Sequence, residues 1–290
     1  MNITFEEAIK EYLKYSKMKL KKSTYEELER KINKHILFYF KNKNIYNTSI
    51  KDIISWKEYI ESFNYKYNYK SYLFYALNGL YEFLVKYYNI NKNIASLEGN
   101  FKNNDSIATG NIWTIEEFNQ FISVISNKQH KLLFKLLYFT GLRKGELLAL
   151  TWNDIDFINN TININKTITR NHEIQTPKTK SSNRIISISR SIILDLKYLK
   201  EQSKSDIIFN ISFTQLKRIK DYYCILSGVK QIKIHEFRHS HACYLFKNNI
   251  EIEDISYRLG HSDISMTMST YLKYLPRNEK RVIKLLNSVC

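Results

Sequence analysis

The chain has 290 residues, of which 43% are hydrophobic, so it is long enough for two modest domains and too apolar for a disordered polymer. Lys and Arg number 45 against 28 Asp and Glu, giving a formal net charge of +17 that favours a polyanionic partner, above all nucleic acid. No apolar run approaches the roughly 18 to 20 residues that span a bilayer, and Cys224, Cys243 and Cys290 are too scattered for a disulfide framework or a Cys-x-x-Cys metal site.

The N-terminus lacks the pattern of a signal peptide. Glu6 and Glu7 stand where such a peptide needs a basic segment followed by an uninterrupted apolar core. We therefore expect a cytoplasmic protein, associated with the nucleoid if its polyanion is DNA.

The first 90 residues predict a small helical domain. Ser or Thr followed three residues later by Glu predicts helix starts at Thr4 and Ser23, each ahead of apolar residues at helical spacing. A third helix opens near Ser49, and a fourth, from about 69 to 88, is apolar almost all round, as is typical of the central helix of a bundle.

Basic and hydroxyl side chains gather around the predicted turn between the first two helices. They are candidate contacts to DNA phosphates, and the alternative is a solvated basic face. The residues are Lys14, Lys17, Lys19, Lys21, Lys22, Ser23 and Thr24.

Helical periodicity fades over residues 91–111, which are rich in Asn, Ser and Gly and predict an interdomain linker. A second domain, residues 112–290, begins at Trp113. Thr114 and Glu117 form another capping-box pattern directly after it.

The second domain mixes helices with a few strands. A buried helix from Lys131 breaks at Gly141, a new helix begins near Arg143, and residues 157–188 alternate apolar and polar side chains as antiparallel strands do. Further helices are predicted over 194–199, 213–226, 235–246 and 252–259, with a last one from about Pro276. The fold class is therefore mostly α with a small antiparallel β-sheet.

His235 and Arg238 lie three residues apart on a predicted helix, so their side chains project from one face and could hold a phosphate. The same residues spell H-E-F-R-H, which matches the zinc motif H-E-x-x-H with Glu236 as the base. A catalytic zinc needs a third protein ligand, and the metzincin extension would require Gly and His where Ala242 and Leu245 stand. Within the motif itself the phosphate and zinc interpretations both stay open.

Other candidates for phosphate chemistry are spread along the second domain. Arg143 begins a helix, where backbone N–H groups already favour an anion, and Glu146 one turn later could orient it. Lys178 follows Pro177 between two strands; His261 follows Gly260 at a helix end; Tyr271 comes ten residues later. Each residue alone is equally consistent with a solvated or structural role.

In this order, Arg143-x-x-Glu146, Pro177-Lys178-Thr179, His235-x-x-Arg238, Leu259-Gly260-His261 and Tyr271 resemble the tyrosine recombinase, or phage integrase, family. The helical N-terminal segment is similar to that family's SAM-like core-site-binding domain. The length implies the two-domain form without an arm-binding domain, and an α+β catalytic domain.

The resemblance implies a site-specific DNA recombinase that needs no metal or nucleotide cofactor. Tyr271 would attack the scissile phosphate to form a 3′-phosphotyrosyl bond, Arg143 and Arg238 would hold the non-bridging oxygens, and His261 would support the same charge. Lys178 would protonate the 5′ oxygen and His235 would assist proton transfer. The expected partners are double-stranded DNA with inverted-repeat core sites, a homotetramer that passes through a Holliday junction, and an accessory directionality factor.

Some positions depart from the family pattern or leave a choice. Lys273 stands where many members have His, Gly145 stands where Ser is frequent, and Tyr274 is a rival nucleophile. His239 and His241 are expected to be structural or to flank the phosphate. The final helix, from about Pro276 to Val289, is expected to dock on a neighbouring protomer, as in this family; the alternative is a helix folded back on its own core. A relaxing type IB topoisomerase and a DNA-binding protein with a vestigial site are the alternative functions.

Overall fold

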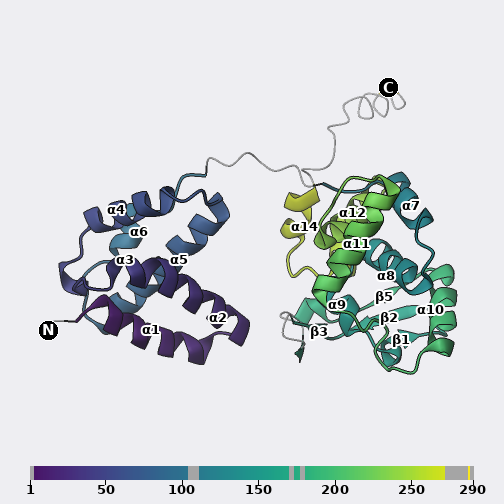
Figure 1. Ribbon diagram of the computed structural model, residues 1–290, viewed down its shortest axis with the longest axis horizontal. Coiled ribbons are helices and arrows are strands. Elements are labelled where there is room, and N and C mark those ends of the chain that lie inside the picture. The colour runs from purple at the N-terminus through teal and green to yellow at the C-terminus, as the bar shows by residue number, and fades with distance from the viewer. Residues whose placement is uncertain (1–2, 104–110, 170–172, 177–179, 272–286, 288–290) are drawn as a thin grey trace. The chain divides into compact units, whose positions relative to one another are not determined.

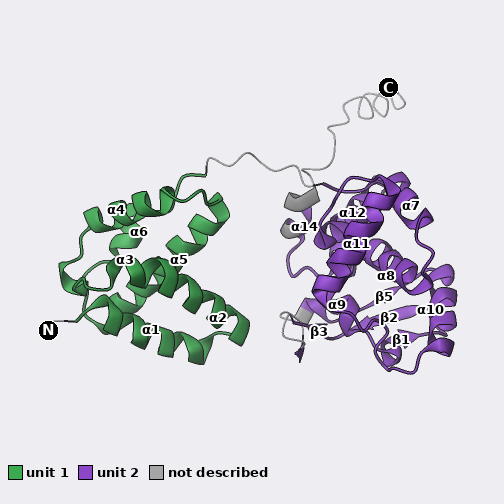
Figure 2. Cartoon of the chain, in the orientation of Figure 1, with its two compact units in different colours: residues 1–108 green, residues 109–290 purple. Residues whose placement is uncertain are grey.

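The computed structural model describes residues 3–103, 111–169, 173–176, 180–271 and 287, without the side chains of Lys180, Met266 and residues 269–271. Two units, residues 1–108 and 109–290, each surround a hydrophobic core of their own (Figures 1 and 2). No helix within the described ranges is both long enough and apolar enough to cross a membrane.

The first unit is helical. Its helices are α1 (Phe5–Lys19), α2 (Lys22–Lys31), α3 (Phe38–Phe40), α4 (Ile50–Glu61), α5 (Tyr67–Tyr87) and α6 (Ile94–Glu98), with a π-helical stretch (Ile32–Leu37) joining α2 to α3 (Figure 1). The capping box predicted at Thr4 is present, the helix expected near Ser49 begins there with a capping box of its own, and α5 buries residues on several of its faces.

Two predictions about the first unit need correction. Ser23 does not cap the second helix. Only Leu20 and Lys21 separate the end of α1 from the start of α2 at Lys22, so Lys21 occupies the N-cap position and Ser23 lies inside the helix. The segment 91–111 also contains more structure than a linker, since it includes α6, and both Ala95 and Phe101 are buried in the first core. The first unit therefore extends beyond residue 90.

The second unit combines helices with two small antiparallel sheets. The helices are α7 (Ile115–Ser123), α8 (Lys128–Thr140), α9 (Lys144–Ala149), α10 (Arg190–Gln202), α11 (Phe213–Ser227), α12 (Ile234–Lys247), α13 (Ile252–Leu259) and α14 (Ile264–Tyr271). The strands are β1 (Ile155–Asp156), β2 (Thr161–Ile164), β3 (Thr167–Ile168), β4 (Ile174–Gln175) and β5 (Arg184–Ser187). This arrangement confirms the predicted mostly α fold class.

The strand region is divided more finely than the sequence predicts. β2 pairs with β5 in the register Ile162↔Ile186, and β1 completes the sheet in the order β1-β2-β5. The chain between β2 and β5 contains a second pair, β3 with β4. Since β3 and β4 are two residues each, alternation over such a length leaves no readable pattern.

The buried helix α8 organises the second core, because it contacts α7, α9, α10 and α12. It ends at Gly141, whose left-handed backbone (φ +65°) reverses the chain so that α9 can begin three residues later. A Cβ at Gly141 would lie 2.7 Å from Leu259 Cδ2 and 2.8 Å from His241 Cδ2. Glycine is therefore required both for the conformation and for the close approach of α12 and α13.

Gly141→Ala is expected to lower the free energy of unfolding of the second unit more than Gly228→Ala does. Both glycines are left-handed helix ends, but a Cβ at Gly228 would meet no atom within 4 Å. Gly228→Ala should lower the free energy of unfolding only by the cost of the left-handed backbone, about 1–2 kcal/mol. Gly141→Ala should lower it by that amount and by an additional ~1–3 kcal/mol from overpacking. Urea unfolding followed by circular dichroism measures both, and equal losses would contradict the packing argument.

Candidate active site

Three of the predicted residues meet at the carbonyl end of α13, and a fourth lies near them. Arg143 is the N-cap of α9, and its Nη2 donates to the Gly260 carbonyl at 3.4 Å. Arg238 lies on α12, and its Nη2 donates to the Leu259 carbonyl at 2.5 Å. His261 follows that turn directly, and His235 lies near enough to both arginines for their charges to lower its pKa. These contacts join segments of the chain that are far apart in sequence.

Arg238 is almost completely buried, with 1% of its surface exposed. Besides the Leu259 carbonyl, its guanidinium binds the Gly141 carbonyl through Nη1 at 2.9 Å. Burying a guanidinium is costly unless its N–H groups are bonded, and these two backbone carbonyls meet part of that need. The guanidinium of Arg238 is therefore held in a fixed direction in a place that excludes water.

Arg143 is held by Glu146, as the sequence suggests. Its Nη1 lies 2.7 Å from Glu146 Oε1, and its backbone N–H donates to Oε2 at 2.9 Å. The Arg143 side chain is 35% exposed, whereas the Glu146 side chain is 3% exposed. A buried carboxylate thus holds both the backbone and the guanidinium of an arginine whose side chain remains accessible to a ligand.

His261 links this turn to α14. Its Nδ1 lies 2.6 Å from the Oγ1 of buried Thr267, one helical turn before Tyr271. Burial, followed by the charges of Arg238 and Arg143, lowers the pKa of His261 to about 4. The imidazole is therefore neutral near pH 7, and a bound phosphate would raise its pKa by offsetting those charges.

His235 and His239 stack edge to face on α12, with ring centroids 4.8 Å apart. Burial, followed by His239, Arg238 and Arg143, lowers the pKa of His235 to about 4. Part of His235 is nevertheless exposed, so salt screens the share of the shift that neighbouring cations cause. His239 also has a lowered pKa, because of its burial and then because of the charge of Arg238.

His241 is structural. It is 2% exposed, and its Nε2 accepts a hydrogen bond from Arg258 Nε at 3.0 Å. Burial and then the charge of Arg258 lower its pKa to about 3. A neutral ring that accepts at Nε2 carries its proton on Nδ1.

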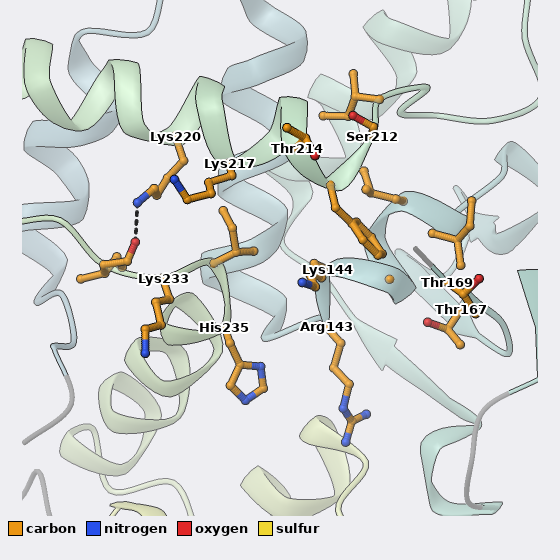
Figure 3. A pocket seen from close by; sticks show the side chains of 17 residues that line it. Arg143, Lys144, Thr167, Thr169, Ser212, Thr214, Lys217, Lys220, Lys233 and His235 are labelled. Carbon is orange, nitrogen blue, oxygen red and sulfur yellow. Dashed lines mark hydrogen bonds between the residues drawn. The ribbon is translucent and has the colours of Figure 1, made fainter. Parts of the chain in front are cut away.

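An open cavity of about 980 Å³ adjoins the site (Figure 3). Arg143 and His235 lie at its edge, and Ser212 and Thr214, from the start of α11, lie across it. Its lining also includes the lysines Lys144, Lys217, Lys220 and Lys233. Among the described residues that line it, none is acidic.

The cavity lysines have different roles. Lys220 is buried, and its Nζ binds Asp221 Oδ1 at 2.6 Å and the Ile232 carbonyl at 2.5 Å, so it holds the wall together. Lys144 and Lys233 are exposed, and Lys144 Nζ lies 4.7 Å from the centre of the Phe213 ring. The exposed pair gives the cavity a cationic edge beside Arg143 and His235.

Some predicted residues lie outside the described part of the structure. These are Lys178, the rival nucleophile Tyr274, Lys273 and most of the predicted last helix. Tyr271 is the final residue of α14, and only its backbone is described. Across the described residues, no three His, Cys, Asp or Glu side chains form a cluster that could hold a metal ion, and Glu236 instead caps α12 through the Lys233 N–H.

The structure adds two residues to the site that the sequence did not single out. Arg184 opens β5 and binds Glu146, and Thr267 binds His261. Arg184 begins the alternating segment and is in phase with Ile186 and Ile188. Its position on the apolar side of the predicted strand was the available signal. Thr267 offered none, because α14 lacks a clear apolar periodicity.

Two family profiles match the chain. The phage integrase family matches residues 113–277, and the N-terminal SAM-like domain of phage integrases matches residues 4–59. The ICEBs1 integrase of Bacillus subtilis (strain 168) is 29% identical over 314 aligned residues, covering 99% of this chain and 84% of that protein. A XerC-like tyrosine recombinase of Caldanaerobacter subterraneus is 30% identical, covering 60% of this chain and 53% of its own length.

Solved structures share the fold. The Tn1549 transposon integrase in complex with a circular intermediate DNA has a TM-score of 0.81 at 18% identity, covering 98% of this chain and 99% of that chain. A lambda integrase dimer bound to a COC′ core site has a TM-score of 0.74 at 17% identity, covering 93% and 95%. A lambda integrase tetramer bound to a Holliday junction has a TM-score of 0.70 at 17% identity, covering 90% and 78%.

Proposed function

Because the chain belongs to the phage integrase family of site-specific tyrosine recombinases, we propose that Arg143, Arg238, His235 and His261, together with Lys178 and Tyr271, cleave and rejoin DNA strands. The observation that carries this proposal is the convergence of both arginines on the carbonyls of one turn, with His261 next to it. Two guanidiniums and a neutral imidazole suit a phosphodiester, whose charge spreads over its non-bridging oxygens.

The proposed reaction is a transesterification. The Tyr271 Oη attacks phosphorus, the bond between phosphorus and the 5′ oxygen breaks, and a 3′-phosphotyrosyl bond forms. The tyrosine proton passes to His235, whose low pKa keeps it neutral and able to accept, and Lys178 gives a proton to the leaving 5′ oxygen. A 5′-hydroxyl from a second duplex reverses these steps, so the strands are exchanged without a net change in the number of phosphodiester bonds.

Tyr271→Phe should abolish covalent capture of DNA while leaving DNA binding intact, because only the nucleophilic oxygen is lost. A nicked duplex carrying the recognition site traps the intermediate, and a denaturant-resistant adduct on a gel measures it. Tyr274→Phe is the matched control and should retain the adduct. An adduct that persists in Tyr271→Phe and disappears in Tyr274→Phe would move the nucleophile to Tyr274.

Strand joining between two duplexes separates recombination from the alternative of a relaxing type IB topoisomerase. Release of a joined product that combines strands of two labelled duplexes is expected here. Relaxation of supercoiled DNA with no such product would favour the topoisomerase.

We propose that the cationic edge of the cavity binds phosphates beside the scissile one. Lys144 and Lys233 are exposed and lie next to Arg143 and His235, and none of the described lining residues opposes their charge. In the first unit the predicted DNA contacts are exposed as well, around the short α1–α2 connection: Lys14, Lys17, Lys19, Lys21, Lys22, Ser23 and Thr24. Exposed side chains of this kind fit a role at the DNA backbone.

Replacing Lys144 and Lys233 together by Ala should weaken DNA binding and make it less dependent on salt. Two lost phosphate contacts reduce the slope of log K against log salt concentration by about 2. Binding titrations at several salt concentrations measure this slope. Lys197→Ala, an exposed lysine of α10 outside the cavity lining, is the control, and an equal change in that variant would remove the cavity from the DNA interface.

We further propose a homotetramer on DNA with inverted-repeat core sites, acting in the cytoplasm and with an accessory factor where direction must be set. The structure of a lambda integrase tetramer bound to a Holliday junction, which shares this fold, supports the assembly. The segment from Pro276 is proposed to join neighbouring protomers.

A chain that ends at Leu275 should bind a single core site as the full chain does. It should fail to form the tetramer, because the segment that is proposed to join neighbouring protomers is missing. Sedimentation with a Holliday-junction substrate measures the assembly. If the shortened chain forms tetramers normally, the proposal that this segment joins neighbouring protomers is wrong.

A further inference from the structure

Three consecutive carbonyls at the end of α13 each accept a hydrogen bond from a different arginine. Arg184 Nε binds the Arg258 carbonyl at 2.7 Å, while the Leu259 and Gly260 carbonyls bind Arg238 and Arg143. These carbonyls form the negative end of the helix dipole, which favours cations. Two of the arginines belong to the proposed catalytic set, and Arg184 does not.

Arg184 is also the second partner of Glu146. Its Nη2 lies 3.0 Å from Glu146 Oε2 and its Nη1 lies 3.3 Å from Oε1, so the two guanidinium nitrogens engage both carboxylate oxygens. Oε1 is the atom that also holds Arg143 Nη1 at 2.7 Å. Burial raises the pKa of Glu146, but Arg184 first and then Arg143 lower it by more, so the carboxylate stays charged.

Arg184 is too deep to reach DNA. Its side chain is 1% exposed, and its Nη1 also donates to the Ser182 carbonyl at 3.0 Å. It packs under the turn as well, because a Cβ at Gly260 would lie 2.9 Å from its Nη1. A residue with these contacts acts on the site through Glu146, through the turn and through its charge, which is one of the smaller causes that lower the pKa of His261.

We propose that Arg184 is a positioning residue, which fixes Glu146 and the end of α13 so that Arg143 and His261 address the same phosphate. The proposal rests on the proposed recombinase function. Lysine could supply the charge at this position but not the planar fork that reaches Glu146 and the Arg258 carbonyl together. A purely structural Arg184 would stabilise the fold without setting the geometry of Arg143.

The experiment compares wild-type protein, Arg184→Met and Arg184→Lys in single-turnover cleavage of the nicked recognition duplex. One substrate carries the normal scissile phosphate and the other a methylphosphonate, in which a methyl group replaces a non-bridging oxygen and removes the charge that arginine offsets. Protein titrations separate the limiting cleavage rate from the half-saturating concentration.

Arg184→Met should lower the limiting rate on the normal phosphate by about 10²-fold, the cost of a small misplacement of a catalytic group. The half-saturating concentration should stay within about threefold, because phosphate contacts elsewhere dominate binding. On the methylphosphonate the loss of rate should shrink to about tenfold or less, since the transition state on this substrate carries less negative charge for Arg143 to stabilise. Arg184→Lys should also be slow on the normal phosphate.

Circular dichroism checks that each variant is folded. If Arg184→Met does not fold because Glu146 is left with one partner, Arg184→Lys and the pair Glu146→Gln with Arg184→Met carry the test, since neither leaves an unbalanced buried carboxylate. Lys135→Met, which breaks the Lys135–Asp195 ion pair (2.7 Å) between α8 and α10, is a control for stability alone and should cleave both substrates as the wild type does.

Equal loss on the two substrates, or a normal cleavage rate in folded Arg184 variants, would overturn the positioning role while leaving the recombinase function in place. A wild-type protein that forms no adduct on either substrate would overturn the proposed function and the inference with it.

Discussion

The active site depends on one constraint, the need of three cations to share the carbonyl end of α13. Like charges at this distance repel one another, and the Arg258, Leu259 and Gly260 carbonyls offset that repulsion by binding one arginine each. Glu146 contributes a full negative charge to two of them, Arg143 and Arg184. In the proposed complex, a phosphate would offset the positive charge of the arginines that meet at this turn.

The pKa values of two histidines are lowered in part by these neighbouring positive charges. His235 and His261 each have a pKa near 4, and after burial the largest contributions come from neighbouring imidazole and guanidinium groups. Both rings are consequently neutral in the free protein near pH 7, which allows one of them to accept a proton. A phosphate would remove part of the repulsion and raise both pKa values, so substrate binding itself would tune the proton transfers.

Local sequence patterns predicted the groups that stand close together in the chain and missed those that are brought together by folding. His235 and Arg238 share a face of one helix, and the break at Gly141 followed by Arg143 is a local signal, so both could be read from spacing. The hydrogen bond from Arg143 to Gly260 spans 117 residues and that from Arg184 to Arg258 spans 74. Periodicity carries no information at such separations, so the role of Arg184 emerged only from the structure, whereas order along the chain sufficed to recognise the family.

The same network explains why a buried arginine is used where an apolar residue would pack at lower cost. Replacing a buried ion pair by apolar groups is often neutral for stability, so stability alone gives Arg184 and Glu146 no evident advantage. Their value lies in geometry: a carboxylate with both oxygens engaged cannot rotate, and the Arg143 side chain that it holds is then confined to one direction. Rigidity beneath the surface allows a partly exposed arginine, free to meet a phosphate, to be as well placed as the buried Arg238.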